Sequence, residues 1–515
     1  MAYIMRQQGN FSQHVRSEFF EYASLLIAGA GVGLFSAASP IVALLVVFGF
    51  AAIAILLYAN AFSYSRESTQ IAAVADETSD KRYRLLFLLF FLSFFISITI
   101  PKSGKTLSGV PITSANILIF ISFILWFISV LFSNGFTSRI PLFNTIIVFI
   151  LYGMLNSILS LFYRNPFRMV LIEFVAFFGF IPAYFLVCTV LRNRHRIEVI
   201  VFAIIISLIL VCLYGMLQLR FGFERIAVPG ITEQYEMIRY AEFGGRWNYI
   251  EGGRQKLYST FQNGNIFGNH LATFLPFLGG IILIIQSQWK KLALSGIFIG
   301  VWYTLFLTYS RGALLGGIVG VFALAVIAKK IHFRAVGVLL VFAISLFIFT
   351  NQHSDRPELA RYNFRRLTSD PNQFSAGRVQ RVESAIKKFR QLPLYQKLFG
   401  LGLGANLVVD NLYVYLFIKL GVIGFFLLVW TLGKFFITLM RLRTQVDDIR
   451  LQSLINGGIA GLIASLVHNI ADVLWFFPPL AANFWFLAGI SMSIGMTNVQ
   501  ERLCVKGLHA SPQNR

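Results

Sequence analysis

The sequence predicts an all-α polytopic membrane protein. Of its 515 residues, 57% are hydrophobic and only 13% are charged. Its apolar runs repeatedly approach the ~20 residues that a helix needs to cross a bilayer. Because these runs are continuous rather than alternating, they are not the strands of an outer-membrane barrel, and helices must do the spanning. We expect about 12 to 14 transmembrane helices.

The apolar segments follow one another along the whole chain. They are 22–39, 41–62, 85–100, 114–133, 141–163, 168–191, 197–219, 263–286, 292–308, 312–328, 335–350, 411–440, 452–475 and 479–496. They divide the chain into N-terminal helices over 1–219, an outer loop over 220–262, helices over 263–350, a large outer loop over 351–410, helices over 411–496 and a tail over 497–515. The polar start of the chain is unlike a cleavable signal peptide, so the first span is expected to be its own insertion signal.

Basic residues in the short loops give the orientation. On one side lie Arg6, Arg16, Arg82, Arg84, Arg139, Arg192, Arg194, Arg196, Lys290, Lys291, Lys329, Lys330, Arg334, Arg441, Arg443, Arg450, Arg502 and Lys506. Since basic loops stay in the cytoplasm, both termini are predicted to be cytoplasmic. The excess of 44 basic over 22 acidic residues therefore reflects membrane orientation, and nucleic acid is not an expected partner.

The two long segments, 220–262 and 351–410, then face outward, and connections of this length are usually functional. Segment 220–257 mixes basic, acidic and aromatic residues, as a sugar-contacting surface or an interfacial aromatic belt would. Segment 378–392, RVQRVESAIKKFRQL, has apolar residues at helical spacing with Arg and Lys between them, which predicts an amphipathic helix at the membrane interface. The three cysteines have no disulfide or metal-type spacing.

Polar residues gather at three of the outward-facing helix ends. The first place is GGRQKLYSTFQNGNIFGNHLATFLP, where Arg254, Thr260, Asn263, Asn265 and Asn269 enter a span. A helix cap at Ser259 or Thr260 accounts for one or two of these residues, but not for all of them.

The second place is TYSRGALLGG, which puts Ser310 and Arg311 at the start of an apolar run. A charge costs at least ~2.5–3.5 kcal/mol at mid-bilayer and less near an edge, so Arg311 either snorkels to the interface or binds an anion. Two arginines from separate helices, Arg254 and Arg311, would suit a diphosphate, because guanidinium forks match phosphate oxygens.

The third place is LVHNIADVLWFFPPLAANFW, with His468, Asn469 and Asp472 at the outer end of a span. His468 and Asp472 are four residues apart and share a helix face, so Asp472 has the right spacing to orient His468. That leaves His468 as either a packing residue or a group that transfers protons.

These stretches resemble a known family. GGRQKLYSTFQNGNIFGNHLATFLP is similar to the Gly-Arg, Thr-Phe and Asn-x-Asn pattern of the bacterial O-antigen ligase and polysaccharide polymerase superfamily, and TYSRGALLGG is similar to its Ser-Arg-Gly signature. LFGLGLGANLVVDNLYVYLFIKLGVIGF resembles its third element, a Gly-rich turn, a polar pair and an aromatic helix. The resemblance covers roughly residues 240–496; each motif is short, and their order and spacing make the combination specific.

The resemblance implies a GT-C-type transferase that takes a glycan from a polyprenyl diphosphate carrier at the outer face of a bacterial inner membrane, facing the periplasm or cell exterior. Arg254 and Arg311 would grip the donor diphosphate, with Thr260, Asn263, Asn265, Ser310 and Asn411 around the substrate. No metal or other cofactor is expected, since the outer loops lack an Asp-x-Asp pair or a His cluster. Membrane lipid, a chain-length regulator and a flippase are the implied partners.

One departure favours a polymerase. Ligases that use lipid A core carry a histidine before the asparagine of the third motif, whereas this chain has Asp410 before Asn411. Asp410 is our first choice for the base that takes the acceptor proton, and His468 is the second; a helix cap is the alternative role for Asp410. A ligase that acts on lipid A core or protein remains the alternative reaction. A flippase or transporter is disfavoured, because the chain has no visible repeat.

Overall fold

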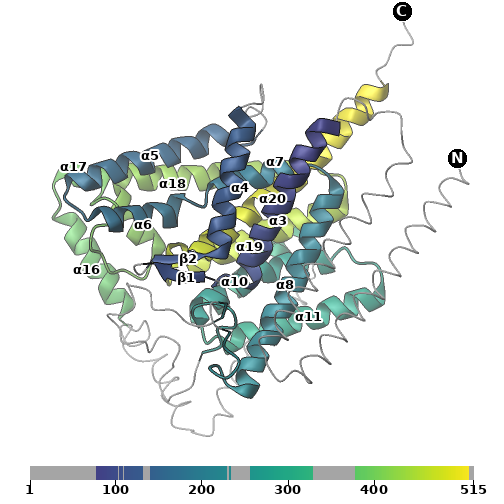
Figure 1. Ribbon diagram of the computed structural model, residues 1–515, viewed down its shortest axis with the longest axis horizontal. Helices are drawn as coiled ribbons and strands as arrows, with labels where there is room; N and C mark the ends of the chain where they lie inside the picture. The colour runs from purple at the N-terminus through teal and green to yellow at the C-terminus, as the bar shows by residue number, and fades with distance from the viewer. Residues whose placement is uncertain are drawn as a thin grey trace, which may run out of the picture.

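The computed structural model describes residues 77–102, 104–107, 110–131, 140–228, 231–232, 256–328 and 377–509. The predicted spans 22–39, 41–62 and 335–350 lie outside these ranges, and so does Arg254. Within the described residues the chain is a bundle of helices, shown in Figure 1. Eight spans among those residues are long and apolar enough to cross a membrane, so the chain has the architecture of a multi-pass membrane protein.

The first half of the bundle precedes the predicted outer segment 220–262. Its helices are α3 (Glu77–Thr99), α4 (Ser114–Leu131), α5 (Phe143–Phe162), α6 (Phe167–Phe178), α7 (Pro182–Val190) and α8 (Arg194–Phe221). A hairpin of β1 (Gly104–Leu107) and β2 (Val110–Thr113) joins α3 to α4 with Gly104 opposite Thr113. The sequence did not predict this hairpin.

The second half contains the helices around the predicted site. They are α10 (Gly264–Ile282), α11 (Gln288–Leu307), α12 (Arg311–Ala328), α16 (Arg378–Arg390), α17 (Leu394–Phe399), α18 (Leu412–Gln445), α19 (Ile449–His468), the 3₁₀ turn η3 (Leu474–Phe476) and α20 (Pro478–His509). Helix α16 confirms the helix predicted over 378–392, and its Phe389 packs on Phe417 of α18 with ring centroids 4.6 Å apart.

Two predicted spans are interrupted. The span 168–191 is divided into α6 and α7 at Gly179–Ile181, and Pro182 begins the second helix, where a missing N–H costs nothing. The span 411–440 lies within α18, which has a non-helical residue at Gly421. Both interruptions keep the chain within one membrane crossing, so the order of the spans is unchanged.

The helix ends form two opposite faces. On one face, Arg194 at the start of α8 is paired with Asp448, which caps α19. Arg443 of α18 donates to the Ile327 carbonyl of α12 at 2.6 Å. These are the loops that the sequence assigns to the cytoplasm. On the other face, Leu257 N–H donates to the Leu307 carbonyl at 3.2 Å. The predicted site residues lie at this second face.

Helices α10, α12 and α19 pack closely around glycines. A methyl group on Gly320 would lie 2.7 Å from Ala464 Cβ and 2.7 Å from Pro276 Cγ, so these three helices meet with no room for a side chain. Small residues permit such close approach between membrane helices. The contact fixes the start of α12 relative to the end of α19.

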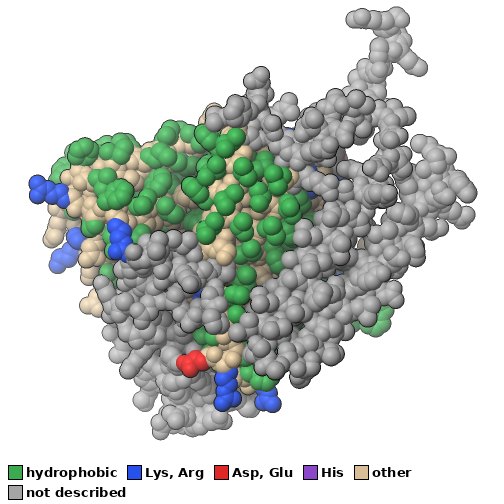
Figure 2. All heavy atoms as spheres, viewed as in Figure 1, with side chains coloured by type: hydrophobic (Ala, Val, Ile, Leu, Met, Phe, Trp, Pro, Cys, Tyr) green, Lys and Arg blue, Asp and Glu red, His purple; other side chains and the backbone are tan. Residues whose placement is uncertain are grey.

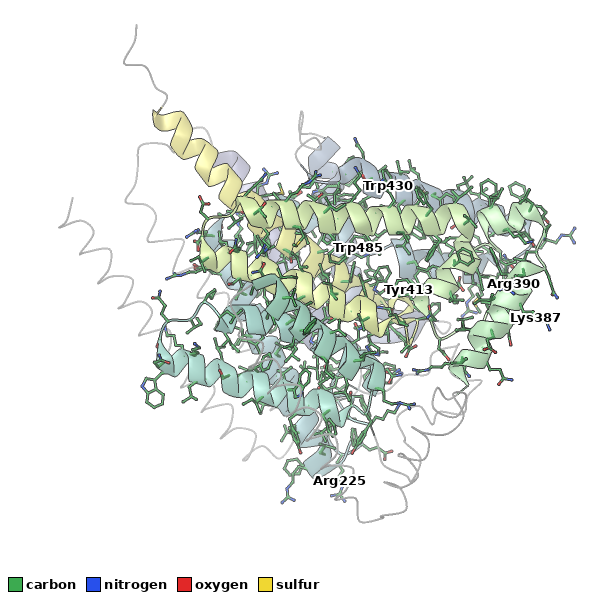
Figure 3. All side chains as sticks on the ribbon, turned by 180° about the vertical axis from the view of Figure 1, so that it is seen from behind. Arg225, Lys387, Arg390, Tyr413, Trp430 and Trp485 are labelled. Atoms are coloured by element: carbon green, nitrogen blue, oxygen red, sulfur yellow. The ribbon has the colours of Figure 1, made fainter. Side chains whose placement is uncertain are left out.

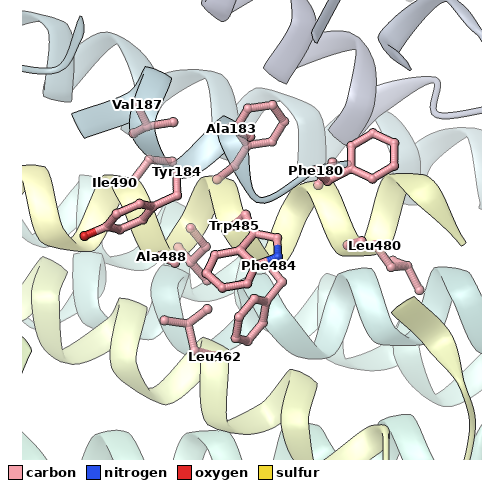
Figure 4. Packing of buried hydrophobic residues seen from close by; sticks show 14 of the residues in the cluster. Phe180, Ala183, Tyr184, Val187, Leu462, Leu480, Phe484, Trp485, Ala488 and Ile490 are labelled. Carbon is pink, nitrogen blue, oxygen red and sulfur yellow. The ribbon is translucent and has the colours of Figure 1, made fainter. Parts of the chain in front are cut away.

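A second core joins α7, α19 and α20. Figure 4 shows Tyr184 and Val187 of α7 beside Trp485 and Ala488 of α20, with Leu462 of α19 on the other side. The Tyr184 and Trp485 rings lie 6.4 Å apart and perpendicular to each other. The α7 half of the interrupted span is therefore buried inside the protein, whereas α5 exposes large apolar side chains such as Leu151 and Ile158, as a lipid-facing helix does.

Candidate functional site

The candidate site lies where α10 and α12 begin and where α19 ends. Arg311 is exposed and is the first residue of α12. Ser310 precedes it, and its hydroxyl accepts a bond from Ala313 N–H at 3.4 Å, as a helix cap does. A cation at the N-terminus of a helix opposes the helix dipole, at a cost of roughly 0.3–1 kcal/mol. Helix stability therefore does not explain why an arginine stands here.

The backbone is strained at two residues, one just before the Ser310–Arg311 turn and one in the segment before α10. Tyr309 and Ser259 both have left-handed φ angles, 51° and 50°, without being glycine. Such residues cost on the order of 1–3 kcal/mol and gather at functional sites. Ser259 is held by a 2.6 Å bond from its hydroxyl to the Val211 carbonyl. The two strained turns lie in neighbouring segments, which Leu257 N–H joins by donating to the Leu307 carbonyl at 3.2 Å.

His468 connects three helices behind Arg311. Its Nδ1 lies 3.2 Å from Asn269 Nδ2 of α10, and its Nε2 lies 3.3 Å from Ser310 Oγ. Since an amide nitrogen only donates, Nδ1 accepts and Nε2 carries the proton that is donated to Ser310. Ser465 Oγ donates to Asn269 Oδ1 at 3.5 Å, which supports that orientation of the amide. His468 is buried, and it holds the Ser310–Arg311 turn in place.

Lys256 places a second cation beside Arg311. Its side chain is half-buried, and burial lowers its pKa from the usual 10.5. The positive charge of Arg378 lowers the pKa further, Asp472 raises it and Arg311 lowers it. Arg378, Asp472 and Arg311 therefore each lie close enough to Lys256 to act on its charge. The site thus combines three cations with one carboxylate.

The polar residues at the start of α10 are divided between structural and site positions. Asn263 caps α10, because its side-chain oxygen accepts from Ile266 N–H at 2.9 Å. Thr260 is buried and donates to the Thr99 carbonyl at 2.6 Å. Asn265, in contrast, donates to Asp472 at 3.0 Å, and both are only partly buried. Of the three predicted substrate residues here, Asn265 is the one directed at the charged groups.

Asp410 and Asn411 lie at the start of α18. Asn411 caps this helix by accepting from Val414 N–H at 3.0 Å, and it also donates to the Ile470 carbonyl at 2.8 Å. The capping role that the sequence left open for Asp410 therefore belongs to Asn411. Asp410 forms an ion pair with Arg381 of α16. That ion pair connects α16 to the residue before the cap of α18.

Of the predicted site residues, Ser310 contacts His468, Arg311 follows Ser310 in the chain, and Asn265 contacts Asp472. Arg254 lies outside the described residues, and Lys256, two residues later, occupies the site. The partner predicted for His468 was Asp472; its partners are instead Asn269 and Ser310. Lys256 stands in the GGRQKLYSTF stretch that carried the prediction, so a second basic residue two positions after Arg254 was an available signal.

The interruption in α18 creates a second polar region. Gly421 has φ 70° and ψ −176°, which frees the carbonyls of the preceding turn. Leu401 N–H donates to the Ile418 carbonyl at 3.0 Å, Gly402 N–H donates to Lys419 at 3.1 Å, and the Tyr152 hydroxyl donates to Leu420 at 2.6 Å. Each freed carbonyl therefore has a protein donor, as backbone within a membrane requires.

A buried ion pair lies beside this interruption. Lys419 Nζ contacts the two carboxylate oxygens of Glu173 at 3.0 and 2.9 Å, and the Tyr415 hydroxyl donates to the same carboxylate at 2.7 Å. Gly404 N–H donates to Glu173 at 2.9 Å, and Lys419 also donates to the Ala405 carbonyl. The pair fastens segment 400–410, which ends at Asp410, to α6 and α18. An acid in span 168–191 and a lysine in span 411–440 were the signals for it.

Fold and site together define a helical multi-pass membrane protein with a cationic, polar site at one membrane face. Neither the protein-family models nor the curated proteins contain a match to this chain.

Proposed function

We propose that the protein is a GT-C-type membrane glycosyltransferase that polymerises polyprenyl-diphosphate-linked oligosaccharide repeat units into a surface polysaccharide. The observation that carries the proposal is the grouping of Arg311 and Lys256 with Arg378 at one membrane face. Cations at that depth suit a diphosphate that is anchored in the bilayer by its lipid. The proposed location is a bacterial inner membrane, with the site facing the periplasm.

The proposed reaction is a displacement at the anomeric carbon of the donor glycan. The acceptor hydroxyl oxygen forms the new bond to this carbon, and the bond from the carbon to the diphosphate oxygen breaks. Arg311 and Lys256 stabilise the negative charge that grows on the departing diphosphate. Asp410 takes the hydroxyl proton, after exchanging its bond to Arg381 for one to the acceptor. His468 acts by holding the Ser310–Arg311 turn.

A transporter deserves comparison, because broken helices and buried charges are common in that class. The part of α18 after Gly421 is about 36 Å long at ~1.5 Å per residue, enough to span the ~30 Å hydrocarbon layer alone. The interruption therefore lies toward the outer end of α18. Its freed carbonyls and the Glu173–Lys419 pair are bonded to protein groups, which favours a structural role over an ion path.

The test uses the purified full chain with lipid-linked repeat units and no other acceptor. A polymerase should build a ladder of longer lipid-linked chains, resolved by gel electrophoresis and mass spectrometry. The matched control is Arg311→Ala. This variant should insert into the membrane normally but leave the lipid-linked units unextended. A wild-type reaction that extends nothing, but joins the glycan to added lipid A core or acceptor protein, would establish the ligase alternative and refute the polymerase.

A further inference from the structure

A group of basic side chains lies at the end of the bundle formed by α16, α17 and the turn between α5 and α6. We call it the basic rim; it consists of Arg164, Arg168, Lys387, Lys388, Arg390 and Lys397. Figure 3 labels Lys387 and Arg390 on α16 at the edge of the molecule. In Figure 2 basic side chains gather at the left edge, where Figure 1 places α16 and α17.

The rim is attached to the bundle at three places. The rings of Tyr163 and Tyr395 lie 6.0 Å apart and join the α5–α6 turn to α17. Asn165 donates to the Leu401 carbonyl at 3.0 Å, and Phe389 packs on α18. The basic side chains therefore have a fixed position relative to the membrane-spanning helices.

Large apolar side chains are exposed between the basic ones. Phe162 is 77% exposed, Leu394 72% and Phe167 67%. An aqueous surface would not keep three such residues exposed together, whereas the membrane–water interface accepts aromatic and aliphatic groups beside Lys and Arg. These residues place the rim at the level of the lipid headgroups.

The charge of the rim contradicts the usual distribution of basic residues. The rim lies at the face that carries the site, opposite the face where Arg194 pairs with Asp448. Basic residues are normally concentrated on the cytoplasmic side, so their density here needs a separate cause. Among the described residues, the ion pairs are Arg194–Asp448, Arg381–Asp410 and Lys419–Glu173, and none of them uses a rim residue.

We infer that the basic rim binds the phosphodiester headgroups of anionic phospholipids in the leaflet on the side of the site. Charge complementarity selects an anionic headgroup, and the exposed Phe162, Phe167 and Leu394 enter the acyl chains below it. Since Arg381 of α16 also holds Asp410, a headgroup bound to α16 sits one ion pair away from the site. The inference concerns lipid binding and does not depend on the proposed reaction.

The test uses the full chain in nanodiscs with photoreactive analogues of phosphatidylglycerol or phosphatidylcholine that share the same reactive group. Mass spectrometry then measures labelling of peptide 391–399. Wild type should prefer phosphatidylglycerol by about 5-fold or more, because each basic residue at an anionic surface contributes roughly that factor. Lys387→Gln/Lys388→Gln/Arg390→Gln leaves Arg164, Arg168 and Lys397 in the rim, so it should reduce the preference for phosphatidylglycerol without abolishing it. The corresponding variant with arginine at 387 and 388 should keep the full preference.

A matched control neutralises Lys290 and Lys291, exposed lysines at the opposite face; it should leave the preference of peptide 391–399 unchanged. Raising the salt concentration should weaken the wild-type preference by screening. Equal labelling of wild type by the two lipids would overturn the inference, whatever the outcome of the transfer assay. A preference that is undiminished in the triple glutamine variant would also overturn it.

Discussion

Arg311 combines three properties that rarely occur together in a structural residue. It is exposed, it is the first residue of a helix, and it lies two residues after Tyr309, which has a left-handed backbone. The last two properties cost free energy, through the helix dipole and through backbone strain. The network of Ser310, His468 and Asn269 behind it keeps this turn in one conformation. These costs are explained if the guanidinium group of Arg311 binds a ligand.

The first prediction concerns Arg311 itself. Arg311→Ala should lower the rate of glycan transfer by roughly 10²–10³-fold, the effect of removing one donor to a developing anion. Arg311→Lys should recover little, because a point charge cannot replace a planar fork. The rate is measured on the lipid-linked substrate, with thermal melting in detergent as the control for folding. Near-normal polymer from the alanine variant would remove Arg311 from the site.

The second prediction concerns pH and Lys256. The pKa of Lys256 is lowered below 10.5 by burial and by neighbouring cations, so it loses its proton at a lower pH than an ordinary lysine. Anion binding favours the charged form. Affinity for undecaprenyl diphosphate should therefore be full below the lowered pKa and fall as pH rises through it. Lys256→Arg stays charged and should keep its affinity at that pH. A parallel decline in both proteins would show that another group titrates.

Residue types predicted the location of the site better than the role of each residue. The structure brings Ser310 and His468 together, but Asn263, Ser310 and His468 serve in it to cap or connect helices. An Asn before a span caps a helix and binds a sugar with the same atoms, so spacing alone does not separate the two roles. Asp410 and Asn411 show the same ambiguity. The sequence allowed Asp410 to cap α18, but Asn411 is the residue that caps it.

The third prediction separates catalysis from structure at Asp410. Asp410→Asn keeps the size of the side chain and its capacity to accept a bond from Arg381, but removes a base. A loss on the order of 10²–10⁴ in transfer rate is expected if Asp410 takes the proton. Arg381→Gln provides the comparison, because it breaks the same ion pair and leaves the carboxylate. If the asparagine variant forms a wild-type ladder, Asp410 is not the base and His468 becomes the candidate.

At the scale of elements, the interruption in α18 could not have been predicted from the span itself. A glycine within an apolar run is ordinary in membrane helices. What makes Gly421 different is segment 398–404, which crosses it so closely that a methyl group on Gly421 would lie 2.3 Å from the Leu398 carbonyl. The donors at Leu401, Gly402 and Tyr152 that satisfy the freed carbonyls come from elsewhere in the chain. Periodicity contains no information about such partners.

The fourth prediction uses two glycines of this same helix. Gly421→Ala should destabilise the protein by more than about 1 kcal/mol, because alanine opposes the positive φ and meets the crossing backbone. Gly433 has no atom within 4 Å of an added methyl group. Gly433→Ala should therefore leave the melting temperature equal to or slightly above that of wild type. Melting is followed by intrinsic fluorescence in one detergent. Equal melting temperatures for both variants would mean that the crossing at Gly421 is not a constraint.

For the whole molecule, composition predicted the helical, multi-pass architecture correctly, because the apolar runs reflect the bilayer as solvent and do not depend on the details of packing. A bilayer requires apolar runs of fixed length and basic loops on one side. Predicted loops that are far apart in sequence accordingly meet in the structure, as Arg194 meets Asp448 and Arg443 meets Ile327. The hairpin and the α6–α7 interruption depend on tertiary partners, which these rules do not contain.

The last prediction assigns the two faces to the two sides of the membrane. The three native cysteines are replaced first, and single cysteines are then introduced at Arg225 and Lys387 on one face and at Lys290 and Thr444 on the other, all exposed positions. A membrane-impermeant maleimide added to intact cells with a permeabilised outer membrane should label the first two and leave the second two unlabelled, because the second face carries the basic short loops. Lysed membranes supply the control, in which every position should react.

Labelling of Lys290 and Thr444 in intact cells, with Lys387 protected, would invert the orientation. The cationic site would then face the cytoplasm, where soluble nucleotide-activated donors exist, and the argument for a lipid-anchored donor would fail with it.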